Sequence, residues 1–295
     1  MEKVKLFYNP KSGKEEASKA LDQVIALHEA AGLELSPLRL QKGISIKDMT
    51  QDLADYKYAI IMGGDGTLNS VIDHLLNVDI DIPIGIIPAG TANDFAKHLS
   101  ITDNVEEATK NIINSKPVFM DIGKLNHRYF VNLASTGFFA NPFDITEDKK
   151  KSKLGKLAYI FNGISQLKNL QCFDFKLHSS EYSYEGSLLG VIILNGKSIA
   201  NVELAPKASS GDGLLDVLVF KESFLDYKFQ NAFNLILEGN FDNLEGIDHF
   251  KSSKIYLECN DQPLTDLDGE RGPKLPGTIS CIKKRLKLMG INYII

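Results

Sequence analysis

The residues with the clearest chemical potential form a glycine-rich turn in the first quarter of the chain. The apolar run Tyr58–Met62 ends in the segment GGDGTLN, residues Gly63–Asn69, and a helical pattern follows. Glycines admit positive φ and let backbone N–H groups approach a ligand without an intervening Cβ. The unpaired amides and positive dipole end of a helix starting at Thr67 favour an anion such as phosphate. The sequence therefore predicts phosphate binding at this turn.

Asp65 places a carboxylate inside this turn, where a simple phosphate cradle would avoid negative charge. The carboxylate is explained if a divalent cation lies between it and the phosphates. Two better-known phosphate loops are excluded, because no segment fits GxxxxGK[ST] and Gly64–Asn69 departs from GxGxxG at its last position. A tight strand-to-helix turn with no ligand is the alternative when this motif is taken alone.

Two further turns of the same character follow other predicted strands. The segment NPKSG closes the strand Val4–Asn9, and PAGTANDF, Pro88–Phe95, follows the strand Ile84–Ile87. Each offers hydroxyls, amides and small residues where a strand ends. Because open α/β sheets bind ligands beyond the carboxyl ends of their strands, the three turns together favour a nucleotide site.

Strands and helices alternate up to about Pro117, which predicts a parallel sheet with helices on its faces. After that point short strands dominate, apart from helical patterns at Leu154–Leu167 and Leu225–Leu237, so we expect a second, mostly-β domain of sandwich type. The predicted boundaries are a nucleotide-binding α/β domain over residues 1–120 and a β-rich domain over 121–285. The last residues, about 286–295, are expected to form a strand that packs back on the first domain.

Composition limits the class of protein. The chain has 295 residues, 43% hydrophobic and 24% charged, as in ordinary globular proteins. No apolar run approaches the roughly 18 residues of a membrane span, and no secretory leader is evident, so we expect a cytoplasmic protein. A net charge of −5, from 38 acidic and 33 basic residues, disfavours nucleic acid as a partner. The lysines at 149–156 offer one local basic patch for an anionic membrane surface.

The three glycine-bearing turns, taken together, resemble the catalytic domain of the diacylglycerol kinase family, and most closely its soluble bacterial lipid kinases of YegS and BmrU type. The likeness continues through nearly the whole chain, with motifs in the family's order. These later motifs are LGKLAY at 154–159, LNGK at 194–197, LAP at 204–206, GDGLLD at 211–216 and LDGE at 267–270.

This resemblance implies a first domain of the Rossmann-like, three-layer kind that NAD kinases and phosphofructokinases share, and specific roles for individual residues. It implies a structural Mg²⁺ held by Ser209, Asp212 and Leu214, and a catalytic base in the segment that holds Asp268 and Glu270. Without the resemblance, the residues of both segments, the one with Ser209–Leu214 and the one with Asp268 and Glu270, predict ordinary turns. The residues that match the family's ATP-binding segments are Asn9, Pro10, Lys11, Ser12, Gly13, Gly63, Gly64, Asp65, Gly66, Thr67, Leu68, Asn69 and Thr91, with Gln41 as a weaker correspondence.

The implied reaction is the transfer of the γ-phosphate of ATP to a lipid hydroxyl, with Glu270 accepting the hydroxyl proton and Asp65 acting through Mg²⁺. Asp268 would support the metal or orient the base. Diacylglycerol, giving phosphatidic acid, is the expected lipid, and the family implies a homodimer with peripheral membrane contact. Two alternatives stay open: a small-molecule kinase similar to NAD kinase, and a nucleotide-binding regulator without catalysis.

Overall fold

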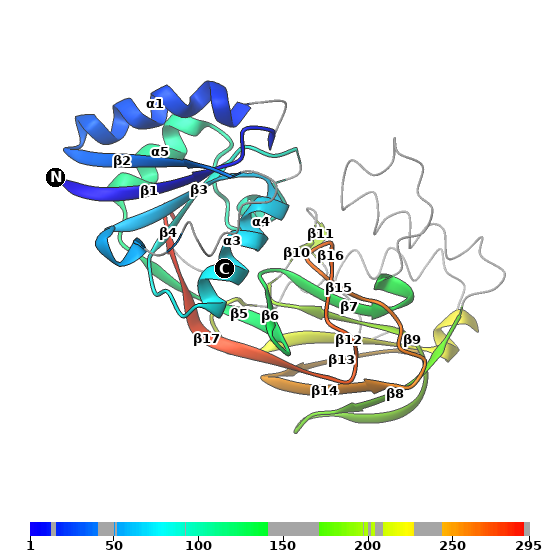
Figure 1. Ribbon diagram of the computed structural model, residues 1–295. Helices are drawn as coiled ribbons and strands as arrows, with labels where there is room; N and C mark the ends of the chain where they lie inside the picture. Colours follow the sequence, from blue (N-terminus) through cyan, green and yellow to red (C-terminus); the bar gives the residue numbers. More distant parts are fainter. Residues whose placement is uncertain are drawn as a thin grey trace. The chain divides into compact units, whose positions relative to one another are not determined.

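The computed structural model describes residues 1–12, 16–40, 50, 52–91, 93–140, 171–196, 198–199, 202–203, 209–226 and 244–291. The chain forms two compact units (Figure 1). Unit 1 contains Met1–Met120 and Lys284–Ile294, and unit 2 extends from Asp121 to Lys283. No helix of the described part is long and apolar enough to cross a membrane.

Unit 1 is built on a parallel sheet in the order β17-β4-β3-β1-β2. Its central strand β3 is buried along its whole length, as expected for a strand with helices on both faces. The strands are β1 (Glu2–Tyr8), β2 (Leu33–Arg39), β3 (Tyr58–Gly63), β4 (Ile84–Pro88) and the end of β17 (Gly277–Met289).

Helices cover both faces of this sheet, which confirms the predicted three-layer, Rossmann-like architecture. Figure 1 shows α1 and α5 on one face and α3 and α4 on the other. The apolar face of α3 is buried at every position: Leu68, Val71, Ile72, Leu75 and Leu76. The helical segments are α1 (Glu16–Ala30), η2 (Leu53–Asp55), α3 (Asp65–Asn77), α4 (Asp94–His98) and α5 (Val105–Asn114).

Unit 2 is a mostly antiparallel β-sandwich, as predicted, with strand order β16-β15-β7-β9-β8-β14-β17 and further pairs β9–β12, β12–β13 and β5–β6. Its strands are β5 (Val118–Leu125), β6 (Arg128–Phe130), β7 (Leu133–Gly137), β8 (Phe173–His178), β9 (Ser183–Leu194), β10 (Ser198–Ile199), β11 (Val202–Glu203), β12 (Leu215–Lys221), β13 (Ile247–Ser252), β14 (Lys254–Cys259), β15 (Thr265–Leu267), β16 (Glu270–Arg271) and the start of β17, with 3-10 segments η3 (Phe138–Ala140) and η5 (Glu222–Asp226).

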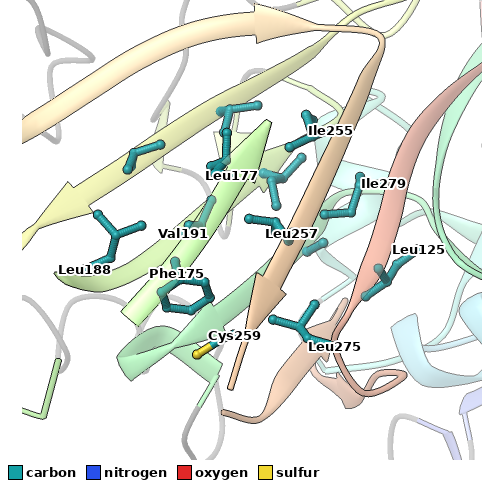
Figure 2. Close-up of a cluster of buried hydrophobic side chains, with 14 of the residues drawn as sticks. Leu125, Phe175, Leu177, Leu188, Val191, Ile255, Leu257, Cys259, Leu275 and Ile279 are labelled. Carbon is teal, nitrogen blue, oxygen red and sulfur yellow. The ribbon is translucent and has the colours of Figure 1, made fainter. Parts of the chain in front are cut away.

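The core of unit 2 follows the two-residue period of its strands. Along β8 every second side chain is buried, and these side chains meet alternate residues of β14 in one apolar cluster (Figure 2). Phe175, Leu257 and Cys259 lie within this cluster, so the Cys259 thiol is a buried core group. Burial raises the pKa of this thiol, which keeps it protonated and unreactive.

The last strand differs from the sequence-based prediction. We expected a strand over residues 286–295, whereas β17 begins nine residues earlier and ends at Met289. The exposed pair Lys283-Lys284 interrupts the apolar pattern and conceals the first half of the strand. The predicted helix at Leu154–Leu167, the lysines at 149–156 and most of the predicted helix at Leu225–Leu237 lie outside the described residues.

Candidate functional site

The three predicted turns lie at one edge of the unit 1 sheet. The strands β1, β3 and β4 are adjacent and parallel, so their carboxyl ends share that edge. Backbone hydrogen bonds tie the turns together: Asn9 N donates to Met62 O at 3.1 Å, and Ala89 N donates to Gly63 O at 3.0 Å. Segments far apart in the sequence thus form one continuous surface of small and polar residues.

Side chains hold the same turns in place. The Asn9 amide donates to Thr67 Oγ1 at 3.0 Å, which joins the first turn to helix α3. Asp65 Oδ1 accepts from Phe95 N at 3.2 Å, which joins α3 to the turn after β4. Asn93 closes that last turn in the left-handed region, with φ of 51°, and its Oδ1 accepts from Gly90 N at 2.8 Å.

Two glycines allow the turns to approach each other. A Cβ added to Gly90 would lie 2.5 Å from Gly64 Cα and 2.7 Å from Asn93 Oδ1, closer than non-bonded atoms approach. A Cβ on Gly64 would lie 3.1 Å from Gly90 Cα. The close approach of the two backbones therefore requires glycine at position 90.

Gly90→Ala is expected to lower the free energy of unfolding by about 1–3 kcal/mol, because the added methyl group overpacks a contact between two backbone segments. Urea unfolding of the variant and the wild type measures the difference. The matched substitution Gly64→Ala meets only the single 3.1 Å contact and is expected to cost less. A Gly90→Ala protein as stable as the wild type would contradict the packing described here.

Helix α3 begins at Asp65, two residues before the predicted start at Thr67. Its first intrahelical bond runs from Leu68 N to Gly64 O at 3.1 Å, so the preceding amides of Asp65, Gly66 and Thr67 have no partner within the helix. Asp65 keeps Oδ2 free of hydrogen bonds in the described part of the chain. A free carboxylate oxygen beside unpaired amides fits a Mg²⁺-bound phosphate.

Asn69 supplies independent evidence for a ligand. Both polar atoms of its side chain, Nδ2 and Oδ1, are buried and have no hydrogen-bond partner among the described residues. A buried amide without partners costs free energy, and such groups in native structures are usually satisfied by protein, water or a bound molecule. Asn69 lies one turn after Asp65 on α3, in the segment predicted to bind phosphate.

The other nucleotide-binding candidates differ in exposure. Pro10 is buried, Ser12 is half-buried, and Lys11 and Thr91 are exposed at the edge that bears the turns. Gly13 and Gln41 lie outside the described residues.

In unit 2, Asp268 and Gly269 form a two-residue hairpin between β15 and β16. Leu267 pairs with Glu270 across this turn. The φ angles of Asp268 and Gly269 are 53° and 88°, as a type I′ turn requires, and Asp-Gly is a preferred sequence for that turn. The turn presents Glu270 as the first residue of the outgoing strand.

The Asp268 carboxylate is bound by backbone. It is 5% exposed and accepts from the amides of Val131, Asn132 and Leu133 at 2.7, 2.9 and 2.9 Å. The chain between β6 and β7 leaves the strand conformation where these amides turn toward Asp268. This geometry suits a structural anchor, and the second of the two roles predicted for Asp268, orienting the base, is the one it favours.

Glu270 is half-buried and takes part in an ion pair. Its Oε2 lies 3.3 Å from an Nη of Arg128, with the two side chains 40% and 30% exposed. The partial exposure leaves the carboxylate open to a proton donor from outside the protein. Sequence reasoning missed Arg128, which lies directly after the turn Asn126-His127 in a strand that pairs with β5, because a single basic residue in a strand carries no distinctive pattern.

The turn that carries Ser209, Asp212 and Leu214 is held by hydrogen bonds from two sides. Asp212 Oδ1 accepts from Leu214 N at 2.9 Å, and the Ser209 hydroxyl accepts from Gly211 N at 3.3 Å. Asp121, which the sequence analysis did not select, is 1% exposed and accepts from Gly213 N at 2.6 Å. This buried contact fixes the turn against β5.

Lys251 neutralises the turn's carboxylate. Its ammonium lies 3.0 Å from Asp212 Oδ2 and 3.5 Å from Asp216 Oδ2. Burial alone would lower the pKa of Lys251, but the hydrogen bond to Asp212 and the charges of Asp216 and Asp212 outweigh it and raise the pKa. No cluster of three acidic, histidine or cysteine ligands occurs among the described residues. In this arrangement Lys251 pairs with the Asp212 carboxylate, and the Mg²⁺ site predicted at Ser209, Asp212 and Leu214 stays a prediction.

Asp212→Ala is expected to lower the free energy of unfolding by about 1–2 kcal/mol, because Leu214 N loses its acceptor and Lys251 loses a charged partner. Urea unfolding with and without Mg²⁺ measures this effect, with Asp174→Ala on the exposed side of β8 as the control. The structural reading predicts the same loss in both conditions. A loss seen only with Mg²⁺ present would instead assign the stabilisation to a bound ion.

Comparisons with known proteins agree with this geometry. The profile of the diacylglycerol kinase catalytic domain matches residues 3–125, and that of the YegS C-terminal NAD kinase beta sandwich-like domain matches residues 133–290. The chain is 31% identical over 281 residues to a diacylglycerol kinase of Bacillus subtilis, covering 94% of this chain and 92% of the relative.

A second relative, a diacylglycerol kinase of Staphylococcus saprophyticus, is 30% identical over 298 residues. The alignment covers 99% of this chain and 96% of the relative. A crystal structure described as a diacylglycerol kinase of Bacillus anthracis superimposes with a TM-score of 0.81 at 27% identity, covering 99% of this chain and 97% of that one. With the two family models matched in order over residues 3–125 and 133–290, the chain belongs to the diacylglycerol kinase family of lipid kinases.

Proposed function

We propose that this protein transfers the γ-phosphate of ATP to the hydroxyl of diacylglycerol, giving phosphatidic acid. The observation that carries the proposal is the edge of unit 1, where three linked turns combine unpaired helix amides with the unpartnered amide of Asn69. The relatives named diacylglycerol kinase support diacylglycerol as the acceptor.

In this proposal the unit 1 turns hold the phosphates of ATP. The amides of Asp65, Gly66 and Thr67 donate to phosphate oxygens. The buried side-chain amide of Asn69 forms hydrogen bonds with the nucleotide. The free oxygen of Asp65 is the protein ligand for Mg²⁺. When bound, Mg²⁺ neutralises charge on the phosphate oxygens and so stabilises the transition state.

Glu270 is proposed as the general base. It accepts the proton of the lipid hydroxyl as the hydroxyl oxygen attacks the γ-phosphorus, and the bond to the bridging oxygen of ADP breaks. Asp268 acts as the anchor of the turn that carries Glu270. Because diacylglycerol resides in membranes, the proposal includes contact with the membrane surface during turnover.

The proposal is tested by offering the purified protein γ-labelled ATP, Mg²⁺ and single acceptors in mixed micelles. The acceptors are diacylglycerol, a prenol, a sphingoid base and phosphatidylglycerol, with NAD tested in buffer. Labelled phosphatidic acid is the expected main product. Label in NAD would identify a small-molecule kinase, and ATP binding without transfer to any acceptor would identify a regulator.

A further inference from the structure

The proposed base Glu270 lies on a strand that does little to fix it. Strand β16 has two residues and, in the described part of the chain, pairs with β15 alone, at the end of the unit 2 sheet order. Glutamate has a flexible side chain, and holding it in one conformation costs free energy. A general base needs a defined position relative to the proton that it accepts, so an additional contact must restrict the Glu270 carboxylate.

That contact is made by Arg128. We propose that Arg128 is a positioning residue for phosphoryl transfer, whose guanidinium holds the Glu270 carboxylate in its working orientation. The inference rests on the proposed function, because it assigns the support of the same base. One Nη of Arg128 lies 3.3 Å from Glu270 Oε2.

Arg128 is itself held in place. It opens β6 and pairs with Leu125 across the tight turn Asn126-His127, in which Asn126 has a φ of 53°. Its Nε atom is buried. The guanidinium therefore extends from an ordered hairpin to Glu270 and differs from a mobile surface arginine.

The same short segment anchors the hairpin that carries Glu270. Arg128 contacts Glu270, and the amides at 131–133, three residues further along, bind the carboxylate of Asp268. The segment 128–133 thus fixes both the backbone turn and the side chain that follows it. Two independent contacts between the same two segments are what a rigidly presented base requires.

The pair contributes little to stability, since ion pairs that are partly exposed to water are weak. Its effect is therefore expected in catalysis. Lysine keeps the charge of Arg128 but lacks the planar, multiple-donor guanidinium, so it should replace the function only in part.

The experiment compares Arg128→Met, Arg128→Lys and Arg128→Ala with Arg271→Met, which removes an exposed arginine next to Glu270. We expect Arg128→Met to lower kcat about 10- to 100-fold with little change in the KM for ATP, and Arg128→Lys to recover part of the loss. Millimolar guanidinium should restore activity to Arg128→Ala but leave Arg271→Met unchanged.

Unfolding midpoints that match the wild type exclude general damage to the fold. Full activity in Arg128→Met, or equal losses in Arg128→Met and Arg271→Met, would overturn the proposal. A crystal structure of Arg128→Met gives a reading that does not depend on activity: we expect several conformers of Glu270 where Arg271→Met has one. If the wild-type protein phosphorylates no lipid, the proposed function is wrong. A single, unchanged Glu270 conformer in the Arg128→Met structure would separately overturn the positioning role.

Discussion

Glu270→Gln is expected to lower kcat for lipid phosphorylation by about 10²–10⁴-fold, the range that a general base contributes. Glutamine has nearly the shape of glutamate and can still accept a hydrogen bond from Arg128, so the hairpin should stay intact. What it loses is the ability to accept the proton of the lipid hydroxyl. The measurement is the transfer of label from γ-labelled ATP to diacylglycerol in mixed micelles at saturating substrate.

Glu185→Gln is the matched control. Glu185 also forms an ion pair in unit 2, an exposed one with Lys176 at 3.4 Å, but it lies on β9, away from the Asp-Gly turn. Its substitution should leave kcat within twofold of the wild type. Normal turnover in Glu270→Gln would remove Glu270 from the mechanism and leave the base to be sought elsewhere.

Asp65→Asn is expected to lower kcat/KM for ATP·Mg²⁺ by about 10²-fold or more, because a neutral amide is a much weaker Mg²⁺ ligand than a carboxylate. The substitution retains an oxygen that can accept from Phe95 N, so the link between the two turns should survive. Loss of charge and loss of structure are thereby separated. Steady-state kinetics at several Mg²⁺ concentrations, together with unfolding by urea, give both readings.

The control for Asp65→Asn is Asp73→Asn, farther along α3. It removes the same charge from the same helix, and activity should be retained. Similar losses in the two variants would indicate that helix charge in general matters and would contradict a specific role of Asp65 at the phosphates. A stable Asp65→Asn protein with unchanged dependence on Mg²⁺ would contradict the metal ligand role.

Sequence patterns were sufficient for unit 1 because its signals are local and agree with one another. Each strand is a short apolar run, each turn carries glycine or asparagine, and α3 shows its buried face at helical spacing. The common edge of the three turns then follows from the parallel sheet alone. The hydrogen bond from Asn9 to Thr67 could not be predicted, because it joins residues 58 positions apart.

Unit 2 was harder to predict, because its partners are set by long-range pairing. The Asp-Gly turn before Glu270 is evident as a hairpin signal, but nothing local indicates that Asp268 binds the amides at 131–133. The role of Lys251 is equally non-local, since it lies on β13 and reaches Asp212 in the turn before β12. Arg128 and Lys251 were missed for the same reason: a single basic residue in a strand carries no distinctive pattern.

The most direct test of phosphate binding by the unit 1 turns is a titration of the ¹⁵N-labelled protein with ATP and Mg²⁺, followed by amide NMR. If the turns bind the phosphates, the backbone amide signals of Gly64, Gly66 and Gly90 should shift together with the side-chain amide signal of Asn69. The backbone amide signal of Gly211 should not shift. Adenosine without phosphates should leave the three glycine signals in place. Saturation with ATP that moves none of these signals would contradict the site described here.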